Sequence, residues 1–262
     1  MCAAHNRLRN AARLFHPRIG LVSGTWSRDI RGATVTIRWM IFVAALALAS
    51  PAKADETVAI EGSRAVLLKP AAPKASVILM PGGDGDLQAG PGGSIGKLKN
   101  NQLVRTREAY KAQGLAVLVV DADINLAAAV DYMRAIKSPV TVIGTSRGTL
   151  RAAAGIARGA RPDALVLTAG FLSPASGGDR HVMSILGSPE KLPPTLVIHH
   201  RQDGCRHTKP AGVEPFIAWA GGKARVAWLD GGQAVGNPCQ AKSHHGFLGL
   251  DGKVVALAAG FK

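Results

Sequence analysis

One serine of the chain lies between two glycines in a pattern typical of a catalytic nucleophile. The segment Gly144-Thr145-Ser146-Arg147-Gly148 fits G-x-S-x-G, with an apolar stretch before it and an alanine-rich stretch after it. In this pattern the serine occupies a sharp turn between a strand and a helix, and glycines let the two elements approach. We therefore predict that the hydroxyl of Ser146 attacks a carbonyl carbon.

A serine hydroxyl needs a histidine to take its proton and a carboxylate to orient that histidine. Downstream of Ser146, Asp203 and His245 follow in the order serine, acid, histidine that accompanies the G-x-S-x-G turn. Each follows a predicted strand, so both are expected at the edge of the sheet that presents Ser146. We therefore expect Ser146, Asp203 and His245 to form a catalytic triad.

Other residues are alternatives for these roles. Asp230, before a Gly-Gly turn, and Asp251, in a predicted helix, are alternative acids, and His244 is an alternative base. Four nearby side chains are of types that bind zinc: His199, His200, Cys205 and His207. Their spacing, however, matches no recognisable pattern of zinc ligands. We predict that the chain uses no metal and no cofactor.

Predicted strands and helices alternate along the chain. A strand pair is expected at 57–60 and 64–69, followed by apolar strands at 76–80, 115–120, 140–143, 164–168, 195–199 and 224–229. Helices are expected at 102–113, from the cap Asp123 to Ser138, at 150–159, 214–220 and 246–259. This order predicts an α/β fold with a mostly parallel central sheet and helices on both faces. Residues 84–100, rich in glycine, predict a mobile loop beside the serine.

Together these motifs resemble the α/β-hydrolase superfamily, in its small lidless branch near dienelactone hydrolases and acyl-peptidase catalytic domains. Residues 57–261 carry the resemblance, with Asp203 inside HHRQDGC and His245 inside SHHGF. The segment 169–194 is too short for a lid, so the resemblance implies an open site without a cap domain.

The resemblance also implies an oxyanion hole made of backbone N–H groups. One donor would be Arg147, at the start of the helix after the nucleophile, and the other Gly83, in the loop after an earlier strand. Here Pro81 replaces the histidine that usually precedes this glycine pair.

Positive charge is spread through the 262 residues, whose formal net charge is +15. Residues 1–54 hold eight basic residues and one acid, which leaves a net charge of +8 for the remainder. Only 5% of residues are aromatic, and no basic run alternates with them, so the composition disfavours nucleic-acid binding. A basic surface would instead favour anionic substrates or envelopes.

A secretory signal is expected within residues 31–54. Arg31 and Arg38 precede an apolar run that ends at Ala49, and Ala52-Lys53-Ala54 fits a cleavage site. The mature protein would be periplasmic or secreted, without stable membrane insertion; an uncleaved anchor is the alternative. We expect one domain over 55–262, preceded by an N-terminal extension and signal peptide over 1–54.

Three cysteines occur in the chain, and Cys2 belongs to the predicted removed segment. Cys205 and Cys239 remain as an even pair in an oxidising compartment, so we expect a disulfide between them, with two free thiols as the alternative. Such a bridge would tie the loop of the acid to the loop of the histidine.

The sequence as a whole predicts a serine hydrolase that cleaves carboxylic esters through an acyl-enzyme. Its substrate would be a small molecule or a polymer-attached acyl group. Alternatives are an amide or peptide hydrolase of the same fold, a non-catalytic envelope binding protein, and a binder of nucleic acid or another anionic polymer.

Overall fold

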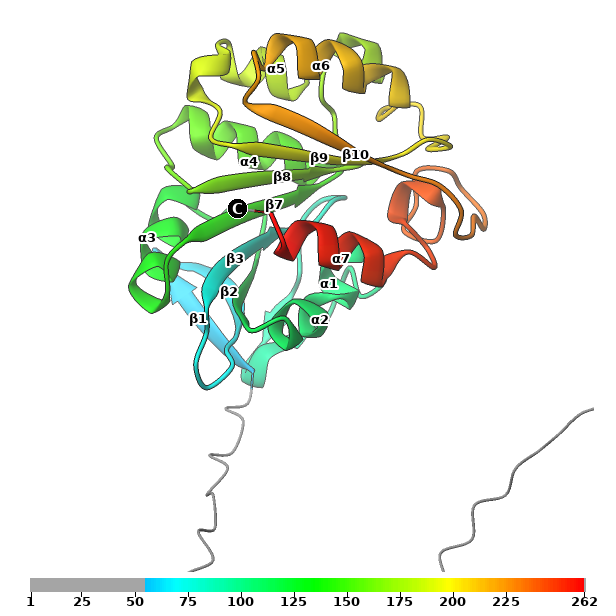
Figure 1. Cartoon of the computed structure of the whole chain (residues 1–262). Coiled ribbons are helices and arrows are strands. Elements are labelled where there is room, and N and C mark those ends of the chain that lie inside the picture. The colour runs from blue at the N-terminus through cyan, green and yellow to red at the C-terminus, as the bar shows by residue number, and fades with distance from the viewer. Residues whose placement is uncertain (1–54, 262) are drawn as a thin grey trace, which may run out of the picture. The chain divides into compact units, whose positions relative to one another are not determined.

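An eight-stranded sheet runs through residues 55–261, the part of the chain that the computed structural model describes (Figure 1). The predicted extension, signal peptide and Cys2 lie outside these residues. In spatial order the strands are β1 (Glu56–Ile60), β2 (Ser63–Leu68), β6 (Leu115–Val120), β3 (Ala75–Met80), β7 (Val140–Thr145), β8 (Ala164–Thr168), β9 (Thr195–His200) and β10 (Ala224–Leu229).

In this spatial order, all neighbouring strands from β6 to β10 are parallel. Strand β2 pairs in antiparallel orientation with β1 on one side and with β6 on the other. This confirms the predicted α/β class and the mostly parallel sheet. Strands β6 and β7 are buried along their whole length, as their continuous apolar and β-branched sequences indicate. Because parallel strands end at one edge, the loops after β3, β7, β9 and β10 lie along that edge.

Helices cover both faces of the sheet (Figure 1). Side chains alternate along each strand, so Ile78 joins one core cluster and Leu79 the other. One face is covered by α3 (Leu126–Ile136), α4 (Arg147–Ala157), α5 (Val182–Leu186) and α6 (Val213–Trp219). The other face is covered by α1 (Gln102–Arg105), α2 (Arg107–Ala112) and α7 (Asp251–Ala259).

Three predicted helix boundaries were wrong. The helix expected at 102–113 is interrupted at Thr106, where φ is −100° and the side-chain hydroxyl donates to the carbonyl of Gln102. The cap of α3 is Asn125, which accepts from the N–H of Ala127, rather than Asp123. The last helix begins at Asp251, because residues 244–246 form a separate turn.

Two segments expected to be loops contain packed structure. Residues 84–100 include the short hairpin of β4 (Ala89–Gly90) and β5 (Ser94–Ile95), with Leu87 fully buried. Residues 169–194 include α5, which packs on α4 and buries Val182 and Leu186. Both segments use apolar residues too few and too irregularly spaced to give a periodic pattern.

Candidate active site

Ser146 occupies a strained turn between β7 and α4. Its φ is 53° and its ψ is −124°, values that a residue with a side chain adopts rarely. A Cβ added to Gly144 would lie 2.8 Å from the carbonyl oxygen of Gly148, and one on Gly148 would lie 2.0 Å from that of Met80. Both glycines are therefore required for the strand and helix to meet, as the G-x-S-x-G pattern predicts.

The Pro81-Gly82-Gly83 loop after β3 lies directly against the serine. A Cβ on Gly82 would come within 2.9 Å of the Ser146 Cβ, so this loop approaches closely only because it carries glycine. The guanidinium of Arg151 donates to the carbonyl of Pro81 and, at 3.4 Å, to that of Gly83. This tether holds in place the loop that carries the predicted donor Gly83.

The other predicted donor, Arg147, is the first residue of α4. A backbone N–H at this position has no partner in its own helix and lies at the positive end of the helix dipole. Arg147 directly follows the serine, and Gly83 lines the same pocket as Ser146. Both predicted donors thus lie near the nucleophile, Arg147 as its neighbour in the chain and Gly83 in the same pocket.

Asp203 and His245 lie side by side at the carboxyl edge of the sheet, and both are buried. Nδ1 of His245 is 3.0 Å from Oδ2 of Asp203, and the other carboxylate oxygen accepts from the N–H of Cys205 at 2.9 Å. A proton on Nδ1, shared with the carboxylate, leaves Nε2 of His245 as the free base.

Thr208 completes this group, and no motif in the sequence points to it. Its hydroxyl donates to Oδ2 of Asp203 at 3.0 Å and lies 3.0 Å from Nδ1 of His245. The Thr208 carbonyl in turn accepts from Nε2 of His199 at 2.9 Å. Burial lowers the pKa of His199 to about 4, so this imidazole is neutral at pH 7.

The alternative acids have other partners. Asp230 pairs with Arg201 at 3.3 Å, and Asp251 pairs with Arg105 at 2.7 Å. Neither of these carboxylates lies within hydrogen-bond distance of His245, whereas the carboxylate of Asp203 does.

His244 also points elsewhere, since its ring stacks on that of His200 with centroids 4.3 Å apart. The zinc alternative does not fit the structure, because the Cys205 sulfur is in a disulfide and cannot act as a thiolate ligand. Within residues 55–261 no group of three or more His, Cys, Asp or Glu side chains is arranged to hold a metal ion.

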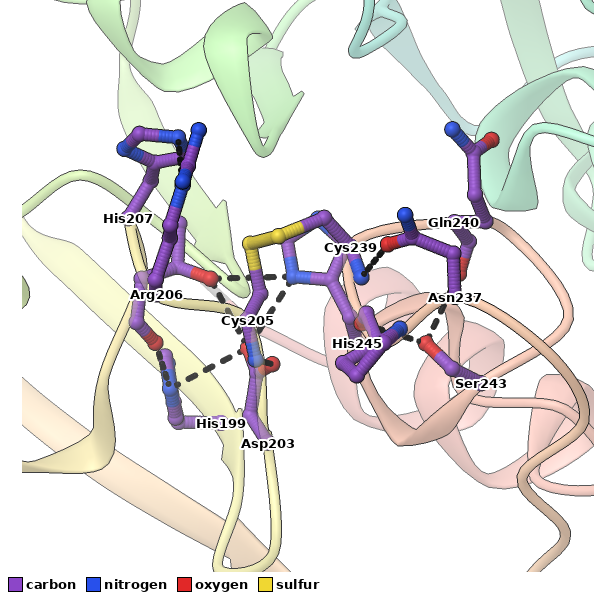
Figure 2. The surroundings of a disulfide bond; sticks show 12 residues. His199, Asp203, Cys205, Arg206, His207, Asn237, Cys239, Gln240, Ser243 and His245 are labelled. Carbon is purple, nitrogen blue, oxygen red and sulfur yellow. Dashed lines mark hydrogen bonds and ion pairs between the residues drawn. A yellow bond between two sulfur atoms is a disulfide. The ribbon is translucent and has the colours of Figure 1, made fainter.

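Cys205 and Cys239 form a disulfide, with their Cα atoms 4.4 Å apart (Figure 2). The bridge joins the loop after β9, which carries Asp203, to the loop after β10, which carries His245. It therefore crosslinks the two loops whose side chains form the acid–base pair.

A pocket of about 310 Å³ brings the remaining parts together. Its lining includes Ser146, His245, Gly83 and Cys239. Ser146 and His245 thus line one cavity, although residues 55–261 contain no hydrogen bond between the Ser146 hydroxyl and the His245 imidazole.

No family model and no curated protein matches the chain. Solved structures do match it. TT1662 from Thermus thermophilus is 16% identical, over 77% of this chain and 94% of that chain, with a TM-score of 0.56. The esterase domain of a Rhodothermus marinus protein is 17% identical, over 79% and 98%, with a TM-score of 0.55. An esterase from the bacterial hormone-sensitive lipase family is 17% identical, over 79% and 82%, with a TM-score of 0.51.

These likenesses and the strand order show that the chain has the α/β-hydrolase fold, as the sequence resemblance predicted. Within residues 55–261 no cap domain is evident, because the connection between β8 and β9 contains only α5 and short turns.

Proposed function

We propose that this α/β-hydrolase-fold chain is a serine hydrolase that cleaves carboxylic esters. The observation that carries the proposal is the strained turn at Ser146, which lines the same pocket as His245. Nδ1 of this histidine is bonded to Asp203. Strained backbone at non-glycine residues clusters at active sites, and here it occurs at Ser146, in the pocket that His245 also lines.

In the proposed mechanism Nε2 of His245 takes the proton of Ser146 as Oγ attacks the ester carbonyl carbon. The carbonyl oxygen becomes an oxyanion, which accepts from the N–H groups of Arg147 and Gly83. His245 then gives its proton to the leaving alcohol, and the acyl group stays on Ser146. A water molecule, deprotonated by His245, cleaves this acyl-enzyme and releases the acid. Asp203 keeps Nδ1 protonated and stabilises the imidazolium throughout.

One observation favours esters over amides. Two of the structures that share this fold with the chain are named esterases. The connection between β8 and β9 is too short for a cap, which leaves room at the site for a bulky or polymer-attached acyl group.

We also propose that the mature protein acts in the periplasm or outside the cell. The support is the disulfide together with the signal-like sequence before Asp55. Within residues 55–261 no helix has the length and hydropathy needed to cross a membrane. Cell fractionation and N-terminal sequencing of the product test this location: a cytoplasmic protein with an intact N-terminus would contradict it.

A fluorophosphonate probe and a panel of nitrophenyl esters and aminoacyl anilides test the enzymatic proposal. Wild type should be labelled and should hydrolyse esters, while Ser146→Ala should lose labelling and about 10⁴-fold or more in kcat. His245→Gln should be similarly impaired, and the neighbouring His244→Gln serves as the matched control that retains activity. Anilide cleavage without ester cleavage would indicate the peptidase alternative, and absence of labelling and turnover a non-catalytic binding protein.

A further inference from the structure

A second and larger cavity, of about 740 Å³, lies along α4, the helix that follows Ser146. Four arginines line it, and one carboxylate, Asp179, faces them. We call it the arginine cavity, defined by Arg147, Arg151, Arg158 and Arg180.

Three of these arginines share one face of α4 and its cap: Arg147 and Arg151 lie in the helix, and Arg158 directly follows it. Positions 147, 151 and 158 fall within about 40° of one another around the helix, because each residue advances by about 100°. The segment 147–158 contains no acid that could neutralise them. Among residues 55–261, none of the four arginines forms an ion pair with a carboxylate.

This arrangement is unfavourable for the isolated protein. A cation at the start of a helix opposes the helix dipole, and Arg147 and Arg151 are like charges one turn apart. Burial lowers the pKa of Arg151, Asp84 raises it, and the charge of Arg147 lowers it further. Sites that concentrate uncompensated charge in a cleft attract ligands of the opposite sign.

The arginine cavity borders the reacting centre. Arg147 follows Ser146 in the chain, and the guanidinium of Arg151 holds the Pro81–Gly83 loop that supplies the second predicted oxyanion donor. Phe171 and His207, stacked with centroids 6.0 Å apart, form an aromatic part of the wall. The two cavities share no lining residue, so a substrate with its carbonyl at Ser146 would reach this cavity by passing Arg147, the next residue in the chain.

We propose that the arginine cavity binds a negatively charged group of the substrate, a carboxylate or a phosphate, so that the preferred substrates are anionic esters. This inference rests on the proposed function. Arg158 and Arg180 are exposed and have no tether to the oxyanion loop, so they are the residues that hold the anion. Guanidinium groups suit this task because their N–H donors match carboxylate and phosphate oxygens in pairs.

Paired substrates that differ only by a charge test the inference. The 4-nitrophenyl monoester of dodecanedioic acid and its methyl-capped counterpart place the charge on the acyl side, on a chain long enough to approach Arg158, which lies about 16 Å from Arg147 along α4. The acetate esters of 12-hydroxydodecanoate and of 12-hydroxydodecyl phosphate, each against its own methyl-capped counterpart, place a carboxylate or a phosphate at a similar distance on the alcohol side. Wild type should prefer the charged member of at least one pair by about tenfold or more in kcat/KM, the strength of one hydrogen bond between ionic groups.

The double variant Arg158→Gln/Arg180→Gln should abolish that preference while neutral esters keep their kcat/KM. The matched control, Lys191→Gln/Lys253→Gln, removes two exposed charges outside both cavities and should change neither value. Added salt should lower kcat/KM for the charged esters only.

Two readouts separate this inference from the proposed function. In the first outcome the protein is labelled by the fluorophosphonate and hydrolyses neutral esters, but it shows no preference for charged esters and the double variant has no effect. This result would overturn the anionic-substrate inference and leave the esterase proposal standing. A preference that persists in the double variant would place the anion site elsewhere and also overturn it. Absence of labelling and of all ester hydrolysis would overturn both.

Discussion

Thr208 contributes a hydroxyl that Asp203 and His245 share, at 3.0 Å from Oδ2 of the one and from Nδ1 of the other. We regard it as a positioning residue, since it acts through Asp203 and His245. Thr208→Val should lower kcat by about tenfold, the value of one hydrogen bond to a charged group, with little change in KM. Thr208→Ser should restore kcat. Steady-state kinetics on a neutral nitrophenyl ester measure this; an unchanged kcat in the valine variant would show that Asp203 alone orients the imidazole.

His199 makes stability depend on pH. Its pKa is about 4 in the folded protein and near 6.5 when exposed, so below pH 6.5 the unfolded chain binds a proton that the native protein does not. The free energy of unfolding should therefore fall as the pH drops from 6.5 to 4, with His199 contributing up to about 3 kcal/mol. His199→Gln, which keeps an N–H donor, should remove this contribution. Urea unfolding of both proteins at several pH values tests this, and parallel pH curves would contradict it.

At the residue scale, the candidate catalytic residues could be predicted from the sequence, but the residues that position them could not. The flanking glycines indicate Ser146. Asp203 and His245 are indicated by their order in the chain and by their positions after predicted strands. Thr208 and His199 carry no such mark, because their role depends on how the loop after β9 folds back on itself. Which of His244 and His245 meets Asp203 depends likewise on the turn over residues 244–246.

At the scale of elements, the elbow depends on the contact between α4 and β3. Gly148→Ala would place a Cβ 2.0 Å from the Met80 carbonyl oxygen, a rigid backbone atom. We expect this change to lower the free energy of unfolding by more than about 3 kcal/mol and to abolish activity, because the helix must move away from the strand. Thermal unfolding and ester turnover measure both effects.

The control for that change is Gly252→Ala in α7, where an added Cβ meets no atom within 4 Å. This variant should be fully active and more stable by about 0.5 kcal/mol, because alanine has less freedom in the unfolded chain. Equal stability of the two alanine variants would mean that the α4–β3 contact is not the constraint on the elbow.

Strands were easier to predict than helix ends. Buried parallel strands such as β6 and β7 are continuous apolar runs, whereas a helix boundary depends on single side chains such as the Thr106 hydroxyl. The helix α5 was missed because it has only five residues, and its apolar side chains find their partners on α4, far away in sequence.

At the scale of the whole molecule, the disulfide closes a loop across 34 residues. In the chain-entropy model this stabilises the folded protein by about 4 kcal/mol. Reduction, or Cys205→Ser/Cys239→Ser, should lower the melting temperature and also kcat, since it releases the Asp203 loop from the His245 loop. Calorimetry and turnover with and without reductant measure this. A lower melting temperature with unchanged kcat would show that the bridge serves stability alone.

The absence of a cap between β8 and β9 has a kinetic consequence. Nothing in the described chain has to swing aside before the alcohol and the acid diffuse out, so bond making and breaking at Ser146 should set the pace of each cycle. Thickening the solvent with sucrose should then leave kcat unchanged. Nor should the rate rise abruptly when an insoluble ester passes from monomers to droplets.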